Sequence, residues 1–414
     1  MKTFNYSDNN SISMVSRSIF ATLILACFLH GCKEQHEAED NLIKINPHEA
    51  KEEINLSEFV DSVKYIPLQT DPGDVLGRVV NITIKENYIY AIDYSQESVY
   101  VFDKKGQYIS KLDKLGRGPG EYPAIGRIII DDNEEYIEMV TRRGKIFKYS
   151  NITFDFIEEY SIPRINFGEV RKKNNIYYFY TQQIDNLVNE EKTNASLLVV
   201  KDGKIEKIFF DKIIETGGSL YGAKNQTLIE NDNNELFVSV IYDNTFYRLS
   251  DMEVEPILTV DFGRYGIDNS IGLKPLQEQM EYLRTSSGLA SFPVLNINNS
   301  GIMSFSYYFF REDSENPFPS INDLHQYIHL RNSNRVYHTK RIKNDITGFP
   351  EEAFICTYNY VGHEAWHDDY LVDIVVPGIY FSDKEKTKKY VEGLGEISIN
   401  DNPVIVLMKP GENM

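Results

Sequence analysis

A five-residue stretch near the C-terminus has the residue types of a zinc protease site. His363 and His367 are four positions apart, and Glu364 follows the first histidine. On a helix, two histidines at this spacing share one face and bind zinc, while the glutamate activates a water molecule. The flanking sequences, FICTYNY and YLVDIVV, instead have the character of strands, and Gly362 directly precedes the motif. We therefore predict a loop or a connection between strands here, with catalytic zinc as the less favoured alternative.

A glycine-rich stretch, GRGPGEY at residues 116–122, raises the question of a phosphate site. Phosphate loops need consecutive backbone N–H donors and usually a helix after them. Pro119 removes one donor, and the sequence that follows, IGRIIIDD, has the pattern of a strand. Proline followed by glycine, here Pro119 and Gly120, is instead typical of a type II turn. We predict a tight corner between two strands from Gly118 to Glu121, with the Glu121 carboxylate accepting bonds from the turn amides.

The N-terminal region has the features of an exported lipoprotein. An apolar run from Ile19 to Leu29 follows Arg17; it is too short to span a bilayer as a helix but suits the core of a signal peptide. The run ends in LHGC, and a leucine three positions before a cysteine resembles the bacterial lipobox, in which the cysteine is lipidated. We predict a lipoprotein signal peptide over residues 1–31, with Met14 as a candidate true start and Cys32 as the lipidated residue. An ordinary signal peptide is the alternative.

The segment after the predicted lipidation site, KEQHEAED, is acidic and lacks large apolar side chains. Such a segment cannot bury enough surface to fold. We therefore predict a flexible acidic tether over residues 32–49 and a folded domain over residues 50–414. A lysine followed by acidic residues at this place also resembles the surface-export signal of Bacteroidetes lipoproteins.

Charge and cysteine content limit the partners. The formal net charge of the 414-residue chain is −19, which argues against nucleic acid because phosphate backbones select basic surfaces. An acidic exterior also repels anionic lipids, so we expect the membrane contact to run through the lipid anchor. Cys27, Cys32 and Cys356 are too dispersed for a disulfide framework or a cysteine metal cluster. We predict no cofactor.

From residue 54 onward, short apolar runs separated by turn residues predict strands. The repeated unit is a strand that ends in Asp or Asn, a polar turn and a second strand, because Asx side chains favour tight turns. The intervals between the five landmark residues are 48, 51, 49 and 81 positions: Asp103, Asn151, Asp202, Asp251 and Asn332. The longest interval contains the one stretch with helical spacing of apolar residues, near 270–288.

A repeat of about fifty residues with about four strands matches a blade of a β-propeller. Five landmarks and a last unit around AFICTYNYVGHEAWHDDYLVDIVV give six blades. The first strand region, INLSEFVDSVKYIPL, and the last, NPVIVLMKP, have no sequence neighbours to pair with, so we expect them to share a blade. The predicted fold class is all-β: a six-bladed β-propeller, closed by its N- and C-terminal strands, with a short helical insertion near 270–288. A β-sandwich or a two-domain chain is the alternative.

The GRGPGEY stretch after the VYVFDKKGQYISKLDKLG hairpin, together with LHGC and the final DNPVIVLMKP, resembles the six-bladed β-propeller lipoproteins of Bacteroidetes. The resemblance covers residues 50–410, and that family shares its blade pattern with NHL-type propellers. It implies a propeller fold and a place in the cell envelope, as an outer-membrane lipoprotein that is periplasmic or surface-exposed. It implies no reaction, because no catalytic residues carry over.

Two functions remain open from the sequence. The favoured one is a non-catalytic binding module, because loops from every blade of a propeller gather around its central channel. The candidate ligands are a glycan, a peptide or a partner protein of an outer-membrane uptake system. The alternative is a metal-dependent hydrolase, with zinc at the histidine motif or with calcium in the channel.

The calcium alternative rests on three aspartates. Six-bladed calcium-dependent lactonases and esterases bind the ion with carboxylates and amides that converge on the channel. Asp93, Asp185 and Asp243 follow apolar runs in successive blades, so they are candidate ligands. The favoured interpretation is that they terminate strands. A second histidine pair, His325 and His329, is interpreted as surface or core of a blade.

Overall fold

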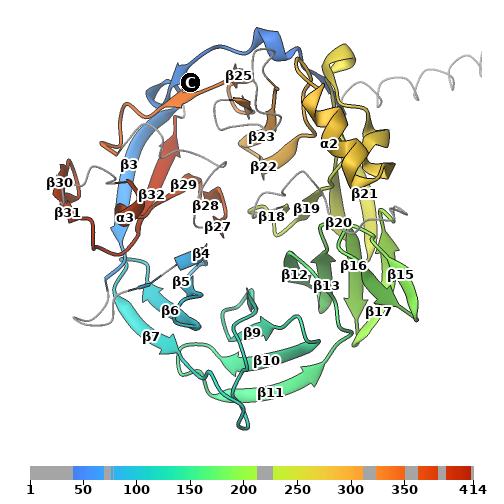
Figure 1. Cartoon of the computed structure of the whole chain (residues 1–414). Coiled ribbons are helices and arrows are strands. Elements are labelled where there is room, and N and C mark those ends of the chain that lie inside the picture. The colour runs from blue at the N-terminus through green and yellow to red at the C-terminus, as the bar shows by residue number, and fades with distance from the viewer. Residues whose placement is uncertain are drawn as a thin grey trace, which may run out of the picture.

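The computed structural model describes residues 41–69, 76–77, 79–211, 227–310, 323–349, 362–380 and 388–411. Six sheets are arranged around a common axis, with the first strand of each sheet nearest the axis (Figure 1). The predicted six-bladed β-propeller is therefore confirmed. Among the described residues, no helix is long and apolar enough to cross a membrane.

The first five blades follow the chain in order. Blade 1 contains β4 (Val79–Ile84), β5 (Tyr88–Asp93), β6 (Ser98–Asp103) and β7 (Tyr108–Leu112). Blade 2 contains β8 (Arg127–Ile130), β9 (Tyr136–Val140), β10 (Lys145–Ser150) and β11 (Phe156–Ser161). Blade 3 contains β12 (Glu169–Lys173), β13 (Ile176–Tyr180), β16 (Leu197–Lys201) and β17 (Lys204–Phe209). Blade 4 contains β18 (Leu228–Glu230), β19 (Leu236–Ser239), β20 (Thr245–Ser250) and β21 (Glu253–Asp261). Blade 5 contains β22 (Val294–Asn298), β23 (Ile302–Tyr308), β24 (Leu324–Leu330) and β25 (Arg335–Thr339).

Blade 6 joins the two ends of the folded chain. Its strands are β28 (Trp366–His367), β29 (Tyr370–Val375), β32 (Val404–Pro410) and β3 (Val60–Pro67). The N-terminal β3 pairs antiparallel with the C-terminal β32, so that Val63 lies opposite Met408. The predicted ring closure is therefore confirmed, and it leaves both terminal strands paired within one sheet.

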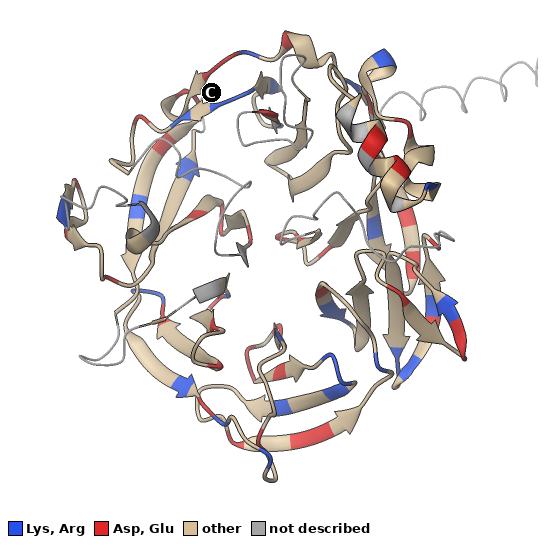
Figure 2. Ribbon diagram, viewed as in Figure 1, with Lys and Arg blue, Asp and Glu red and all other residues tan. Residues whose placement is uncertain are grey.

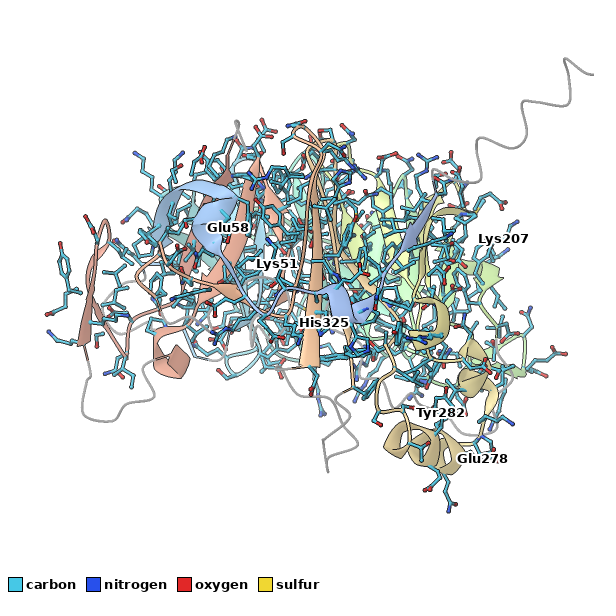
Figure 3. The ribbon with its side chains drawn as sticks, turned by 90° about the horizontal axis from the view of Figure 1, so that it is seen from above. Lys51, Glu58, Lys207, Glu278, Tyr282 and His325 are labelled. Carbon is cyan, nitrogen blue, oxygen red and sulfur yellow. The ribbon has the colours of Figure 1, made fainter. Side chains whose placement is uncertain are left out.

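The segment before β3 forms a strap along the outer side of blades 4 and 5. β1 (Leu42–Lys44) pairs in parallel with the outer strand β21, and β2 (Ile54–Asn55) pairs in parallel with β26 (Ile342–Lys343). Figure 3 shows this strap, on which Lys51 and Glu58 are labelled. The strap therefore adds backbone hydrogen bonds that bind the start of the domain to two blades.

The predicted flexible tether is wrong for residues 41–49. These residues form β1 and a 3₁₀ helix, Pro47–Glu49, and the Ile45 side chain is buried in the core between blades 4 and 5. The preceding residues are acidic, but the contact that Ile45 makes with blades 4 and 5 is apolar. The rest of the predicted tether, including Cys32, lies outside the described residues.

The predicted helical insertion is confirmed between β21 and β22. The helix α2 (Leu276–Arg284) projects from one face of the ring, where Glu278 and Tyr282 are labelled in Figure 3. The buried Gln279 side chain accepts a 2.6 Å hydrogen bond from the Tyr242 hydroxyl of blade 4, which fixes the helix to the ring. The remaining short elements are β14 (Asn186–Val188), β15 (Glu191–Thr193), β27 (Gly362–His363), α3 (Pro377–Tyr380), β30 (Lys388–Val391) and β31 (Gly395–Ser398).

Buried carboxylates connect neighbouring blades. Glu134 of blade 2 accepts hydrogen bonds from the backbone N–H groups of Asn87 and Tyr88 in blade 1. Glu169 of blade 3 accepts from the backbone N–H groups of Thr227 and Leu228 in blade 4. Hydrogen bonds to ionised carboxylates are stronger than neutral ones, so these contacts fix the position of each blade against the next.

Candidate functional site

The His-Glu-x-x-His segment is extended and connects two blades. Its first residues form β27, in which Gly362 pairs in parallel with Asn81 of blade 1. Its last residues form β28 of blade 6, where Trp366 pairs with Leu371. The shared helical face that a zinc site of this type needs is therefore not formed by Gly362–His367, whose backbone is strand and turn. The side chain of His363 lies outside the described part of the structure.

His367 is held by a lysine rather than by a second histidine. Its Nε2 atom lies 2.8 Å from Lys104 Nζ of blade 1 and 3.1 Å from the Asp368 carboxylate. Burial and the positive charge of Lys104 lower the pKa of His367. The neutral imidazole can therefore accept a hydrogen bond from the Lys104 ammonium group, a contact that joins blade 6 to blade 1.

Two ion pairs connect opposite sides of the ring. Lys85 of blade 1 lies 3.9 Å from the Glu230 carboxylate of blade 4. Arg171 of blade 3 lies 3.9 Å from the carboxylate of Glu364, in the segment that enters blade 6. Figure 2 shows charged residues on β12 and β18, the strands of blades 3 and 4 that lie next to the axis. In a ring of six blades, blade 1 lies opposite blade 4 and blade 3 lies opposite blade 6, so the two ion pairs cross the axis.

The surroundings of these ion pairs shift the pKa values of Glu230 and Arg171. Burial raises the pKa of Glu230; Lys85 opposes this shift, and the Glu364 carboxylate adds to it. Burial alone would lower the pKa of Arg171, but Glu169, Glu364 and Glu230 together raise it. The guanidinium therefore stays charged and anchors the carboxylates around it.

A small hollow, with free space for about one water molecule, lies beside these ion pairs. Three segments line it: Ile229–Asn231 of blade 4, Asn296–Asn299 of blade 5, and Glu364–Trp366. The isoleucines and the indole supply apolar surface, whereas the amides and carboxylates supply polar groups. Trp366 is the only tryptophan in the chain. Amides and carboxylates make up most of the lining, so a ligand here would be held chiefly by hydrogen bonds.

One side chain at the hollow carries a buried hydrogen-bond donor that has no partner among the described residues. Asn299 is 4% exposed, and its Oδ1 atom accepts from the backbone N–H groups of Gly301 and Ile302, whereas Nδ2 has no acceptor. Trp366 Nε1 is also buried, but it lies beside the Asp232 carboxylate and lowers the pKa of Asp232 by hydrogen bonding, against the larger raising effect of burial. A buried donor without an acceptor costs about 1–3 kcal/mol, so such groups mark places where a ligand or water completes the bonding.

The sequence pattern over most of the chain matches one family model. That model, "Domain of unknown function (DUF4934)", matches residues 41–409. The chain belongs to the DUF4934 family. No curated protein is significantly similar to it in sequence.

Two crystal structures resemble the fold of this DUF4934 chain. A Bacteroides fragilis protein thought to be exported is 17% identical, with a TM-score of 0.65, and the match covers 89% of this chain and 99% of that one. A DUF4221 family member from Bacteroides vulgatus is 10% identical, with a TM-score of 0.52, and the match covers 85% of this chain and 97% of that one. At these identities the likeness shows the fold alone.

The three candidate calcium ligands of the DUF4934 chain lie in or beside turns that follow strands. The Asp93 carboxylate is buried and accepts from the backbone N–H and hydroxyl of Ser95. The Asp243 carboxylate accepts from the backbone N–H of Thr245, and Asp185 is exposed. Among the described residues, no group of three or more His, Cys, Asp or Glu side chains is arranged to hold a metal ion. The first two contacts are Asx turns, which is the interpretation that the sequence favours.

The glycine-rich stretch forms the corner between blades 1 and 2. The Glu121 N–H donates to the Gly118 carbonyl at 3.1 Å, and Gly120 has a φ of +75°, as the third position of a type II turn requires. The Glu121 carboxylate accepts from the Gly118 N–H at 2.7 Å. Since Glu121 already occupies this amide, the loop uses its donors internally.

The residues at the hollow were not found by sequence reasoning. The motif search selected His363 and His367, whereas the structure places Glu364 and Trp366 of the same segment at the hollow. The single tryptophan was the one available signal, since a lone Trp beside a charged pair stands out from a strand pattern. Arg171 and Asn299 carry no local signal at all.

Proposed function

We propose that this DUF4934 protein is a lipoprotein of the cell envelope that acts as a non-catalytic binding module. Its ligand site is the hollow between blades 4, 5 and 6. The observation that carries the proposal is the buried Asn299 Nδ2 donor, which has no partner among the described residues, beside a hollow lined by amides, carboxylates and the Trp366 indole. A ligand with an acceptor atom would satisfy this donor.

Binding is favoured over catalysis by the state of the titratable groups at the hollow. Glu230 and Glu364 each face a basic side chain from the opposite side of the ring. Each carboxylate thus already faces a cation, whereas a general base needs a free proton-accepting position beside the substrate. The extended backbone of the histidine motif and the turn contacts of Asp93 and Asp243 also argue against the hydrolase alternative.

The envelope location is supported by the N-terminal sequence. The apolar run and LHGC predict export and lipidation at Cys32. Nine residues lie between Cys32 and Leu42, the first residue of β1, and these ten Cα–Cα steps span about 35 Å at most. A lipid on Cys32 would thus hold the propeller close to the membrane surface, where a glycan, a peptide or an uptake partner would reach it.

Replacing Cys32 with serine is expected to release the protein from the membrane. A thiol is needed for the thioether bond to the diacylglycerol, and the hydroxyl of serine cannot replace it. The measurement is membrane fractionation and fatty-acid labelling of the full chain in a Gram-negative host. Cys27→Ser is the matched control and should keep both the label and the membrane association. Labelled, membrane-bound Cys32→Ser protein would contradict the lipoprotein assignment.

Chelation is expected to leave the protein unchanged. A metal bound at one hundred times its Kd would contribute about 2.7 kcal/mol of stability, so removing it would lower Tm by several degrees. We expect the same Tm with and without EDTA, and less than stoichiometric calcium and zinc by elemental analysis. A clear fall in Tm on chelation, reversed by calcium or zinc, would favour the hydrolase alternative instead.

A further inference from the structure

We infer that an arginine cluster at one end of blade 2, together with the adjoining hairpin of blade 3, binds an acidic peptide segment of a partner protein. The cluster consists of Arg127, Arg142, Arg143 and Arg164. It is separate from the hollow: Arg127 begins the inner strand β8, whereas the hollow lies at the ends of the inner strands β18 and β22. Since the inner strands of all blades run in the same direction along the axis, the cluster belongs to the opposite face of the ring. That is the face from which α2 projects (Figure 3).

Backbone contacts gather the four arginines. Arg127 pairs with the last residue of β9, and Arg142 and Arg143 lie in the turn that directly follows β9. Arg164 comes from the segment after β11. A Cβ atom added to Gly144, the next residue of the turn, would lie only 3.2 Å from the backbone nitrogen of Arg164. Three segments of blade 2 thus bring the four arginines to one end of the blade.

The positive charge of the cluster is not compensated within the described part of the chain. Arg142, Arg143 and Arg164 are exposed, and Arg127 is half-buried. None of the four guanidinium groups forms an ion pair with another described residue, whereas nearby Lys145 is paired with Glu159. The net charge of the whole chain is −19, so four unpaired cations together are unusual for this surface. Guanidinium groups bind carboxylates through two parallel hydrogen bonds, so the cluster is suited to acidic side chains.

A hairpin of blade 3 adds apolar surface beside the cluster. The hairpin β14–β15 is fixed to the segment that carries Arg164, because the Asn166 N–H donates to Asn186 Oδ1 at 2.6 Å. Asn186 Nδ2 donates in return to the Asn166 carbonyl at 3.1 Å. Leu187 of this hairpin is 63% exposed, and the preceding Ile184 is 38% exposed. Arginine is enriched in protein interfaces, and exposed apolar surface marks interaction sites, so the two features together indicate a protein partner.

The acidic residues of the same hairpin favour a peptide over an extended anionic surface. Asp185, Glu190 and Glu191 are exposed in the segment that carries Leu187. A phospholipid surface presents negative charge over its whole area, so it would repel these carboxylates. A peptide can instead place its carboxylates against the arginines and its apolar side chains against Leu187. A segment that contains both acidic and apolar residues therefore fits this surface best.

The test selects peptides on the full chain. A displayed library of random peptides is enriched on the immobilised wild-type protein, and the enriched peptides are labelled and titrated by fluorescence anisotropy. We expect Asp and Glu to be about twofold more frequent in the enriched peptides than in the library, together with apolar residues. The affinity should fall as the salt concentration rises, because the attraction is between exposed charges.

The test variant is Arg142→Ser with Arg143→Ser, which removes two exposed charges that have no ion pair among the described residues. We expect the affinity for the selected peptides to fall about tenfold, with Tm unchanged. The matched control is Lys105→Ser with Lys204→Ser, which removes the same charge from exposed positions near turns of the opposite face and should leave the affinity unchanged. Leu187→Ser should weaken binding by about threefold, since it removes exposed apolar surface beside the cluster.

Three results would overturn the inference: no enriched peptide, enriched peptides without an acidic excess, or equal affinity for the wild type and the arginine variant. Phosphatidylglycerol vesicles that bind the wild type but not the arginine variant would assign the cluster to a lipid surface and contradict a peptide partner. None of these results bears on the proposed function, because the hollow lies on the other face of the ring.

Discussion

Replacing Glu138 with alanine is expected to lower the free energy of unfolding by about 3–5 kcal/mol. Glu138 is 1% exposed in β9 of blade 2, and its carboxylate lies 2.6 Å from Lys172 Nζ of blade 3. The same carboxylate accepts hydrogen bonds from the hydroxyls of Tyr177, at 2.7 Å, and Tyr160, at 3.0 Å. Its loss leaves the partly buried Lys172 ammonium group without its carboxylate, and the two tyrosine hydroxyls with only each other as partners, between two blades.

The measurement is equilibrium denaturation with urea. The matched control is Glu158→Ala, which removes a carboxylate from an exposed pair with Lys148 and should cost less than about 1 kcal/mol. A double variant, Glu138→Leu with Lys172→Met, removes both buried charges and should recover part of the loss. Glu138→Ala with the stability of the control would show that this contact does not hold the blades together.

The protein is expected to lose stability as the pH falls from 6.5 towards 4, because two histidines in blade 5, the buried His325 and the half-buried His338, favour the neutral form. The Tyr307 hydroxyl lies 3.1 Å from His325 Nδ1 and 2.7 Å from His338 Nε2. Burial lowers the pKa of His325 to about 3, and His338 and Lys340 lower it in the same direction. Burial also lowers the pKa of His338 to about 4. His325 is thus a core group, whereas its sequence partner His329 is half-buried.

The direction of this pH effect on stability follows from proton binding. Below pH 6.5 these two histidines take up protons in the unfolded chain but stay neutral in the folded one. The free energy of unfolding, which is at its full value above pH 6.5, therefore falls by about 1.4 kcal/mol per pH unit for each histidine. Nearby Asp323 and Glu49 oppose this for His325 and His338 respectively, and the positive form of His48 adds to it for His325. The loss levels off once the folded histidines also protonate.

The double variant His325→Gln with His338→Gln isolates this effect. It keeps polar groups near Tyr307 but removes both titrations, so its free energy of unfolding should depend less steeply on pH between 6.5 and 4. Urea denaturation at several pH values measures the slope. Equal slopes for the variant and the wild type would show that other groups, such as the many carboxylates, cause the acid instability.

The parts of the fold that the sequence predicted are those set by local chemistry. The landmark residues Asp202 and Asp251 have φ values of +48° and +47°, a left-handed conformation that Asp and Asn tolerate better than other side chains. Their regular spacing therefore revealed the outer hairpin of each blade. Ring closure by β3 and β32 followed from two strand patterns that had no sequence neighbour to pair with.

The parts that escaped prediction depend on contacts between distant segments. Ile45 ends the short apolar run LIKI after a polar stretch, and only the surface of blades 4 and 5 gives it a core to enter. The ion pair between Arg171 and Glu364 joins opposite blades and has no periodicity within either strand. The histidine motif drew attention to imidazoles, whereas the contribution of that segment to the hollow comes from Glu364 and Trp366.

The most direct test of the hollow needs no ligand, because its only tryptophan reports on access and charge. Quenching of Trp366 emission is measured with neutral acrylamide, cationic caesium and anionic iodide at equal ionic strength. Trp366 is half-buried beside Glu230 and Glu364, so acrylamide and caesium should quench it and iodide should do so only weakly. Quenching by iodide as strong as that by caesium, or no quenching by acrylamide, would contradict an open, acidic hollow at this place.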